Sequence, residues 1–157
     1  MSAVISPCEK YRYVLHRSLG SALRWYRPFY IVMLNPSTAD ATKDDPTIRR
    51  CISFARREKA THLIVLNLFA LRSTNPEALK TAEDPIGPDN DKHLQEFLVD
   101  DISWKVAAWG SHPFAKERAK DVTRRFGPFH CLGKTKDGSP RHPLYVKSDA
   151  PLKEWSP

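Results

Sequence analysis

Polar side chains suited to binding and acid–base chemistry stand at the ends of several apolar segments. An amide donates and accepts hydrogen bonds at once, and a histidine ring exchanges a proton near neutral pH or donates a hydrogen bond. Serines and a proline accompany them. Converging at one point, these groups would bind and orient a polar ligand. The residues are Asn35, Pro36, Ser37, Asn67, Ser111, His112 and His142.

The apolar segments read as strands separated by helices. We expect strands at about 29–34, 62–68, 104–109 and 129–132, and helices at about 46–59, 89–99 and 114–126. This alternation predicts an α/β fold, a three-layer α/β/α arrangement around a mostly parallel four-stranded sheet. The carboxyl ends of parallel strands share one edge of the sheet, where ligands bind in open α/β folds. The polar residues should therefore meet there.

The remaining segments complete one domain over residues 1–157. An N-terminal β-hairpin is predicted at about 11–27, the α/β core at about 28–145, and a C-terminal tail at about 146–157. The segment 70–88 is rich in proline and should form a long loop, and loops of that length in compact domains are usually functional.

A formal net charge of +7 and an isoelectric point near 9.5 make a polyanionic partner plausible. We expect contacts to nucleic acid, or to a nucleotide-like small molecule, from basic residues near the strand ends and on the helices that follow them. The alternative is that these charges only solvate helix surfaces. The residues concerned are Arg49, Arg50, Arg72, Lys116 and Arg141.

The cysteines Cys8, Cys51 and Cys131 are widely spaced and lack the pattern of a disulfide framework or a zinc site. No apolar run approaches the roughly 20 residues of a membrane span, and residues near Met1 lack a signal pattern. We therefore expect a cytoplasmic protein with reduced thiols, no membrane contact, no cofactor and no metal. The sequence determines neither the oligomeric state nor the roles of the cysteines.

Several long motifs resemble known families. The chain is identified as a member of the uncharacterised family DUF1643, and it more remotely resembles the uracil-DNA glycosylase superfamily over residues 29–145. The second resemblance involves an Asn-Pro segment, an apolar strand ending in Asn, a strand ending in Trp-Gly and a His-Pro segment, in the order of that superfamily. The motifs are Leu34-Asn35-Pro36-Ser37-Thr38-Ala39-Asp40, Asp45-Pro46-Thr47-Ile48-Arg49-Arg50-Cys51, Asn67-Leu68-Phe69-Ala70, Val106-Ala107-Ala108-Trp109-Gly110 and His142-Pro143-Leu144-Tyr145.

The resemblance implies a uracil-DNA-glycosylase-like fold and an N-glycosidic-bond hydrolase acting on a base in DNA or on a modified base. Asn67 would read the edge of a flipped base, and Phe69 would stack on that base, unless it belongs to the core. Asn35 would position the attacking water through its side-chain carbonyl. His142 would donate a hydrogen bond to the departing base, a form of charge stabilisation that is usually the largest catalytic effect.

The chain also departs from the glycosylase pattern. Met33 replaces a glycine, and no carboxylate stands at position 35 to activate water. Asp40 or Asp45 would have to supply that carboxylate, although an aspartate there also suits a helix cap. Leu144 and Tyr145 replace the Ser-Pro that follows the histidine motif, and either would serve as an apolar wedge in DNA.

Two other functions remain open. The first is a non-catalytic module that binds a nucleic acid or a nucleotide in the same pocket. The second is a hydrolase or transferase acting on a small nucleotide-like molecule, with Asp40, Asp45 and His142 as its acid–base groups.

Overall fold

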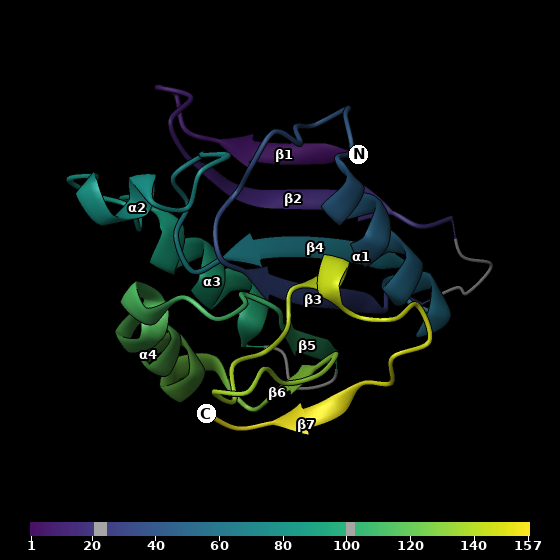
Figure 1. The fold of residues 1–157 in the computed structure, drawn as a ribbon. Helices are drawn as coiled ribbons and strands as arrows, with labels where there is room; N and C mark the ends of the chain where they lie inside the picture. The colour runs from purple at the N-terminus through teal and green to yellow at the C-terminus, as the bar shows by residue number, and fades with distance from the viewer. Residues whose placement is uncertain (21–24, 100–102) are drawn as a thin grey trace.

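A computed structural model describes residues 1–20, 25–99 and 103–157 of the chain. The protein has an α/β fold with one seven-stranded mixed sheet (Figure 1). The strands are β1 (Ser2–Ile5), β2 (Arg12–Ser18), β3 (Pro28–Met33), β4 (His62–Asn67), β5 (Trp104–Ala107), β6 (Phe129–Cys131) and β7 (Lys153–Trp155). The α-helices of the described chain are α1 (Pro46–Arg57), α2 (Ala78–Thr81), α3 (Asn90–Leu98) and α4 (Lys116–Phe126). Short 3₁₀ helices, η1 (Pro113–Ala115) and η2 (Pro143–Tyr145), lie at two loop ends.

The sheet order is β1-β2-β4-β3-β5-β6-β7. The central pairs β4–β3, β3–β5 and β5–β6 are parallel, whereas β2 joins β4, and β7 joins β6, in antiparallel fashion. All residues of β3 are buried, as expected for a strand with neighbours on both sides and helices over both faces. The carboxyl ends of β3, β4, β5 and β6 therefore share one edge.

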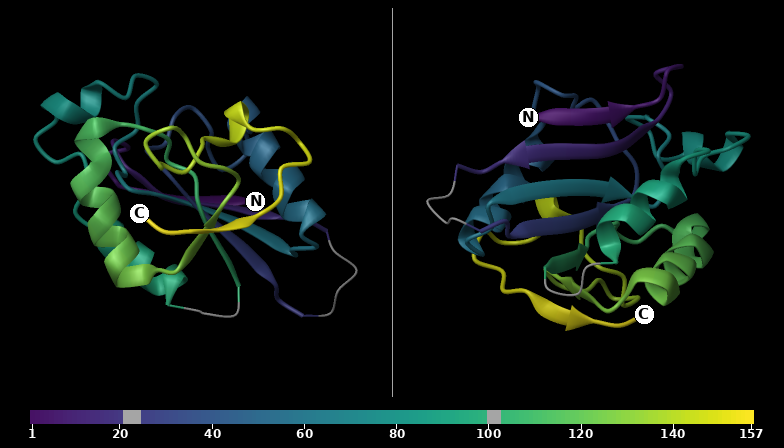
Figure 2. Two further views of the ribbon diagram at one scale, coloured as in Figure 1. Left: turned by 60° about the horizontal axis from the view of Figure 1, so that its bottom comes forward. Right: turned by 180° about the vertical axis from the view of Figure 1, so that it is seen from behind.

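Alternate residues of β3 belong to two separate apolar clusters. Phe29, Ile31 and Met33 pack with the buried side of α1, and Tyr30 and Val32 pack in the cluster that includes α3 and α4. Figure 2 shows α1 and α4 on opposite sides of the sheet. This alternation follows from the two-residue period of a strand.

The start of α1 is determined by local chemistry. The Asp45 carboxylate accepts a hydrogen bond from the Ile48 amide at 2.8 Å, and Pro46 occupies the first helical position, where no amide hydrogen is needed. Arg56 and Arg57 lie in the last turn, where positive charge favours the helix dipole. The loop before α1 is thereby anchored beside the ends of β3 and β4.

The expectation about the N-terminal hairpin needs correction. The N-terminal hairpin consists of β1 and β2 over residues 2–18 and not of residues 11–27. Of the expected second arm, residues 21–24 lie outside the described part of the chain and residues 25–27 form no strand. The tail at 146–157 contains β7, whose Trp155 is buried against the core.

The described helices include none with the length and apolar character needed to cross a bilayer.

Candidate functional site

A cavity of about 550 Å³ opens at the carboxyl ends of β3 and β5. We call it the central cavity. The structure brings six of the predicted site residues to its wall, from the three loops that follow β3, β5 and β6. They are Asn35, Ser37, Ser111, His112, Arg141 and His142.

The Asn35 side chain ties two loops together at the cavity wall. Its Nδ2 donates to the carbonyl oxygens of Pro36, Leu71 and Ser73 at 3.1, 3.3 and 3.0 Å. The Ser73 amide in turn donates to the Pro36 carbonyl at 2.9 Å. Because only the amide nitrogen can face three carbonyl oxygens, the Oδ1 atom lies on the other side of the group and has no hydrogen-bond partner among the described residues.

The His142 ring is oriented by its own loop. Its Nδ1 accepts a hydrogen bond from the Leu144 amide at 3.2 Å, which leaves Nε2 to carry the hydrogen of the neutral ring. Burial lowers the pKa of His142, the nearby His112 lowers it further, and Asp45 opposes the change. His142 is therefore a neutral hydrogen-bond donor at pH 7.

The loop that carries His142 is held against α1. Arg50 donates from its guanidinium to the carbonyls of Pro143 and Val146, and it lies over the Phe54 ring at 5.1 Å from the ring centre. Arg50 was expected to contact nucleic acid. That stays a prediction, and in the structure its guanidinium holds the loop of His142.

His112 and Ser111 follow β5 and also line the central cavity. Burial and the charge of Lys80 lower the pKa of His112, with Glu77 opposing, so His112 is also neutral at pH 7. The Ser111 hydroxyl donates to Asp137 at 2.7 Å. Asp137 also accepts hydrogen bonds from Thr135 and from the Ser139 amide, and these bonds hold its pKa well below the ordinary value.

Two buried arginines hold the loop between β3 and α1. Arg12 donates to the Ala39 carbonyl, and burial lowers its pKa to about 10. Arg17 donates to the Asp40 carbonyl at 2.6 Å and forms an ion pair with Asp44 at 2.7 Å. Since this loop begins at Asn35, both arginines help to position the cavity wall.

The predicted acids Asp40 and Asp45 have structural contacts outside the cavity lining. The Asp40 carboxylate accepts from the amides of Thr42 and Lys43 and from the Thr42 hydroxyl, and these bonds lower its pKa. Asp45 caps α1 but is near enough to raise the pKa of His142. A catalytic role for either stays a prediction.

Other predicted residues lie away from the cavity wall. Asn67 is 1% exposed, and its Nδ2 has no partner among the described residues, whereas its backbone carbonyl accepts from Asn90. Phe69 is buried in the core against Phe114, at 6.1 Å between ring centres, and Pro36 is buried beside Asn35. Among the basic residues, Arg49 donates to the Asp44 carbonyl and Arg72 to the Glu9 carbonyl. Lys116 lines a neighbouring cavity.

Sequence reasoning missed several residues of the wall. Thr47 lies in the first turn of α1, which reads as a capping segment, and Trp109 reads as the end of an apolar strand. The short polar side chains of the two long loops form no motif, so a single sequence does not show which of them line a cavity. The missed residues are Thr47, Ser73, Thr74, Trp109 and Thr135.

In the described residues, no group of three or more histidine, cysteine, aspartate or glutamate side chains is arranged to hold a metal ion. Amides, hydroxyls, neutral histidines and one arginine form the polar part of the central cavity. Such a wall can donate hydrogen bonds to, and accept them from, a polar uncharged or anionic ligand.

Comparison with curated proteins gives no match, and comparison with solved structures gives none. A family model described as "Protein of unknown function (DUF1643)" matches residues 12–144, which include all the strands from β2 to β6 and every residue of the central cavity's wall except Tyr145. The chain therefore belongs to the DUF1643 family.

Proposed function

We propose that the central cavity binds a nucleobase of DNA or of a modified nucleotide, and that the protein hydrolyses the N-glycosidic bond of that base. The proposal takes the resemblance to the uracil-DNA glycosylase superfamily as a guide to the chemistry. In this reaction water adds to the sugar carbon, and the C–N bond breaks with its electron pair going to the base. The water proton ends on the departing base.

The orientation of His142 is the observation that carries this proposal. With Nδ1 occupied by the Leu144 amide at 3.2 Å, the ring presents an Nε2–H group at the cavity wall. A base that leaves as an anion gains negative charge on its oxygens. A fixed donor that is neutral before the reaction stabilises that charge without reorganising.

Asn35, in the loop after β3, supports the same chemistry. Three carbonyl oxygens hold its amide nitrogen, so its Oδ1 is fixed as an acceptor. An acceptor of this kind orients a water molecule but is too weak a base to deprotonate it. We assign to Asn35 the positioning of the attacking water.

A nucleic acid suits the mouth of the cavity better than a free small molecule does. Leu144 and Tyr145 follow His142 and are 46% and 76% exposed. Large apolar side chains beside a cavity contact neighbouring bases when one nucleotide is turned out of the stack. Arg141 lies in the same loop and lines the cavity, and we assign to it the contact with phosphate.

A second candidate function is binding of the nucleobase without hydrolysis. One observation favours it: the described residues that line the central cavity include no carboxylate. A glycosylase without a carboxylate base relies on the stability of the leaving group, whereas a binding module needs only the hydrogen bonds and the basic rim.

The test is incubation with single- and double-stranded oligonucleotides that contain uracil, mismatches or hypermodified pyrimidines, with abasic sites scored by alkaline cleavage. The proposal expects abasic sites on at least one substrate. His142→Asn, which keeps an acceptor for the Leu144 amide, should lose the activity about 10²-fold or more. His142→Gln, which restores a donor near the Nε2 position, should retain more activity than His142→Asn.

Tight binding with no cleavage of any substrate would replace the first function by the second. Neither binding nor cleavage would overturn both. Equal activity in wild type, His142→Asn and His142→Gln would show that the donor has been assigned wrongly.

A further inference from the structure

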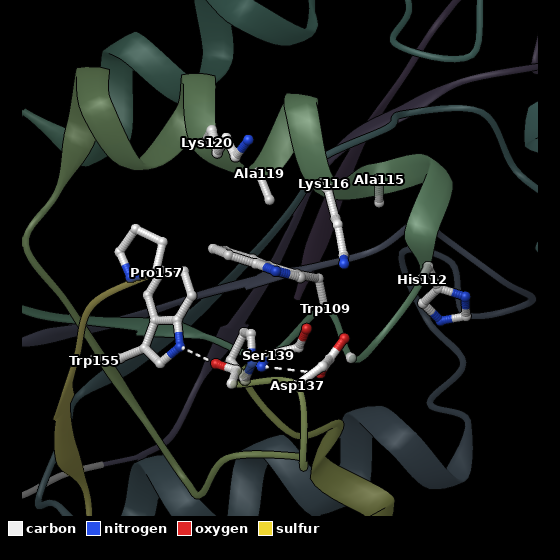
Figure 3. Close-up of a pocket in the computed structure, with 13 residues that line it drawn as sticks. Trp109, His112, Ala115, Lys116, Ala119, Lys120, Asp137, Ser139, Trp155 and Pro157 are labelled. Carbon is white, nitrogen blue, oxygen red and sulfur yellow. Dashed lines mark hydrogen bonds between the residues drawn. The ribbon is translucent and has the colours of Figure 1, made fainter.

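Figure 3 shows a second cavity, of about 230 Å³, which shares lining residues with the central one. We call it the side cavity. A cavity of about 150 Å³ is large enough to bind benzene, so the side cavity has room for a flat ring. Its wall combines indole rings, the small side chains of η1 and α4, and two lysines. These residues are Trp109, Ala115, Lys116, Ala119, Lys120 and Trp155.

The apolar wall of the side cavity is built by Trp109 and Trp155. Their rings are perpendicular, with centres 5.1 Å apart, and both residues are nearly buried. The Trp155 Nε1 donates to the Gly138 carbonyl at 3.0 Å, so its polar atom is already paired. Figure 3 shows Trp109 between the side chains of α4 and those of Ser139 and Asp137. Such a wall favours an aromatic ring.

The charged groups of the side cavity favour an anion attached to that ring. Lys116 is exposed and has no ion pair with a described residue, and Lys120 is paired only with the exposed Glu117 at 2.8 Å. Asp137 is the opposing charge, but its carboxylate already accepts hydrogen bonds from Ser111, Thr135 and Ser139. These bonds keep Asp137 ionised, so the side chains that line the side cavity carry two positive charges and one negative charge.

The two cavities are neighbours that share part of their wall. Trp109, Gly110 and His112 line both. Gly110 has a φ of +77°, and it follows Trp109 directly at the end of β5. A ligand with two linked rings can therefore place one in each cavity, with the connecting phosphate over this wall and near the lysines.

We propose that the side cavity holds the nucleotide next to the one in the central cavity, so that the ligand is an oligonucleotide of at least two residues and not a free base or nucleoside. This inference rests on the proposed nucleobase site. Contact of a base with an aromatic wall strengthens binding by about fivefold or more. Contact of lysine with phosphate makes the additional affinity fall as the salt concentration rises.

Binding of deoxynucleoside monophosphates and of the corresponding dinucleotides, with thymine, cytosine, adenine, guanine or uracil, tests this inference by calorimetry at low salt. In wild type at least one dinucleotide should bind fivefold or more tightly than its monophosphate. Ala119→Leu, which fills the side cavity, and Lys116→Ala combined with Lys120→Ala should each remove most of that advantage. Ala119 does not line the central cavity, so Ala119→Leu should leave monophosphate affinity within about twofold. Lys92→Ala, an exposed lysine of α3, is the charge control.

The outcomes separate the two proposals. Equal affinity for monophosphates and dinucleotides in wild type would overturn the side-cavity inference and leave the nucleobase site standing. An unchanged dinucleotide advantage in both the Ala119 and the lysine variants would also overturn it. No binding of any of these nucleotides, with circular dichroism showing a folded protein, would overturn this inference, and the cleavage assay on oligonucleotides with hypermodified pyrimidines would then decide the proposed function.

Discussion

Asn35 has two roles: its side chain joins two loops, and we propose that it also positions the attacking water. Its Nδ2 donates to the carbonyl oxygens of Pro36, Leu71 and Ser73. Without the side chain these oxygens would lose that donor. We predict that Asn35→Ala lowers the free energy of unfolding by about 1–3 kcal/mol, because it removes a donor from partly buried acceptors. Urea unfolding measures this, and Asn75→Ala, an exposed asparagine in the same loop, serves as the control.

Asn35→Asp sharpens the same argument. An ionised carboxylate facing three carbonyl oxygens is repelled, whereas a protonated one donates to one of them. The variant should therefore be less stable than Asn35→Ala at pH 7 and should recover part of that loss near pH 5. If Asn35→Asp is as stable as wild type at pH 7, the amide nitrogen does not face these carbonyls.

His112 and His142 predict a pH dependence of stability. Burial is the main cause that lowers both pKa values below 6.5, so the unfolded chain takes up protons on these rings before the folded protein does. Proton uptake by the unfolded chain therefore lowers the free energy of unfolding as the pH falls below about 6.5. Above that pH both rings are neutral in both states, and they no longer affect the free energy of unfolding. Melting temperatures at about pH 7.5 and 5.5 measure the change. The double variant His112→Asn, His142→Asn should lose less than wild type, and an equal loss in both proteins would contradict the assignment.

At the scale of elements, α1 holds the loop of η2 through Arg50, and Arg57 holds the chain just beyond it by donating to the Ser148 and Ala150 carbonyls. Arg50 donates to the Pro143 and Val146 carbonyls, whereas its neighbour Arg49 donates only to the Asp44 carbonyl. We predict that Arg50→Ala loosens this loop and that trypsin then cleaves several-fold faster after Lys147, which is exposed. Mass spectrometry of the early fragments measures the rate, with Arg49→Ala as the matched control. Equal cleavage in the two variants would show that other contacts hold the loop.

The elements that the sequence predicts best are those with a long apolar period. The strands near 29–34 and 62–68 and the helices near 46–59 and 114–126 all form with boundaries close to the expected ones. The antiparallel edges were harder to predict. β1 and β7 are short, and β7 has only three residues, too few for a two-residue period to be visible. The burial of Trp155 depends on β6, which lies more than twenty residues earlier.

For the site, sequence reasoning identified residues at the strand ends but not the direction in which each side chain points. Asn35, His112 and His142 reach the central cavity, whereas Asn67 does not. The reason is local in each case. Asn67 is buried, and the Asn90 side chain donates to its backbone carbonyl. A single sequence does not show that these two residues pack together.

At the scale of the whole molecule, the reactivity of two buried cysteines can show whether the two faces of the sheet unfold together. Cys51 lies in the apolar cluster of α1, and Cys131 lies in the cluster of α3 and α4 on the other face. Both are fully buried, and burial raises the pKa of the Cys51 thiol to about 12, so neither should react in the native protein. Cys8 is exposed, and a hydrogen bond with Ser6 lowers its pKa, so Cys8 should react at once.

If the chain is one cooperative unit, both faces of the sheet open together, because they share the same central strands. Iodoacetamide should then modify Cys51 and Cys131 over the same range of urea concentration, and that range should match the loss of the circular dichroism signal. Peptide mapping distinguishes the sites, and a Cys8→Ser variant removes the immediate reaction. Modification of Cys51 at a clearly lower urea concentration than Cys131 would mean that α1 detaches from the sheet before the α3 and α4 face unfolds. The loop anchored by Arg50 would then be released with it.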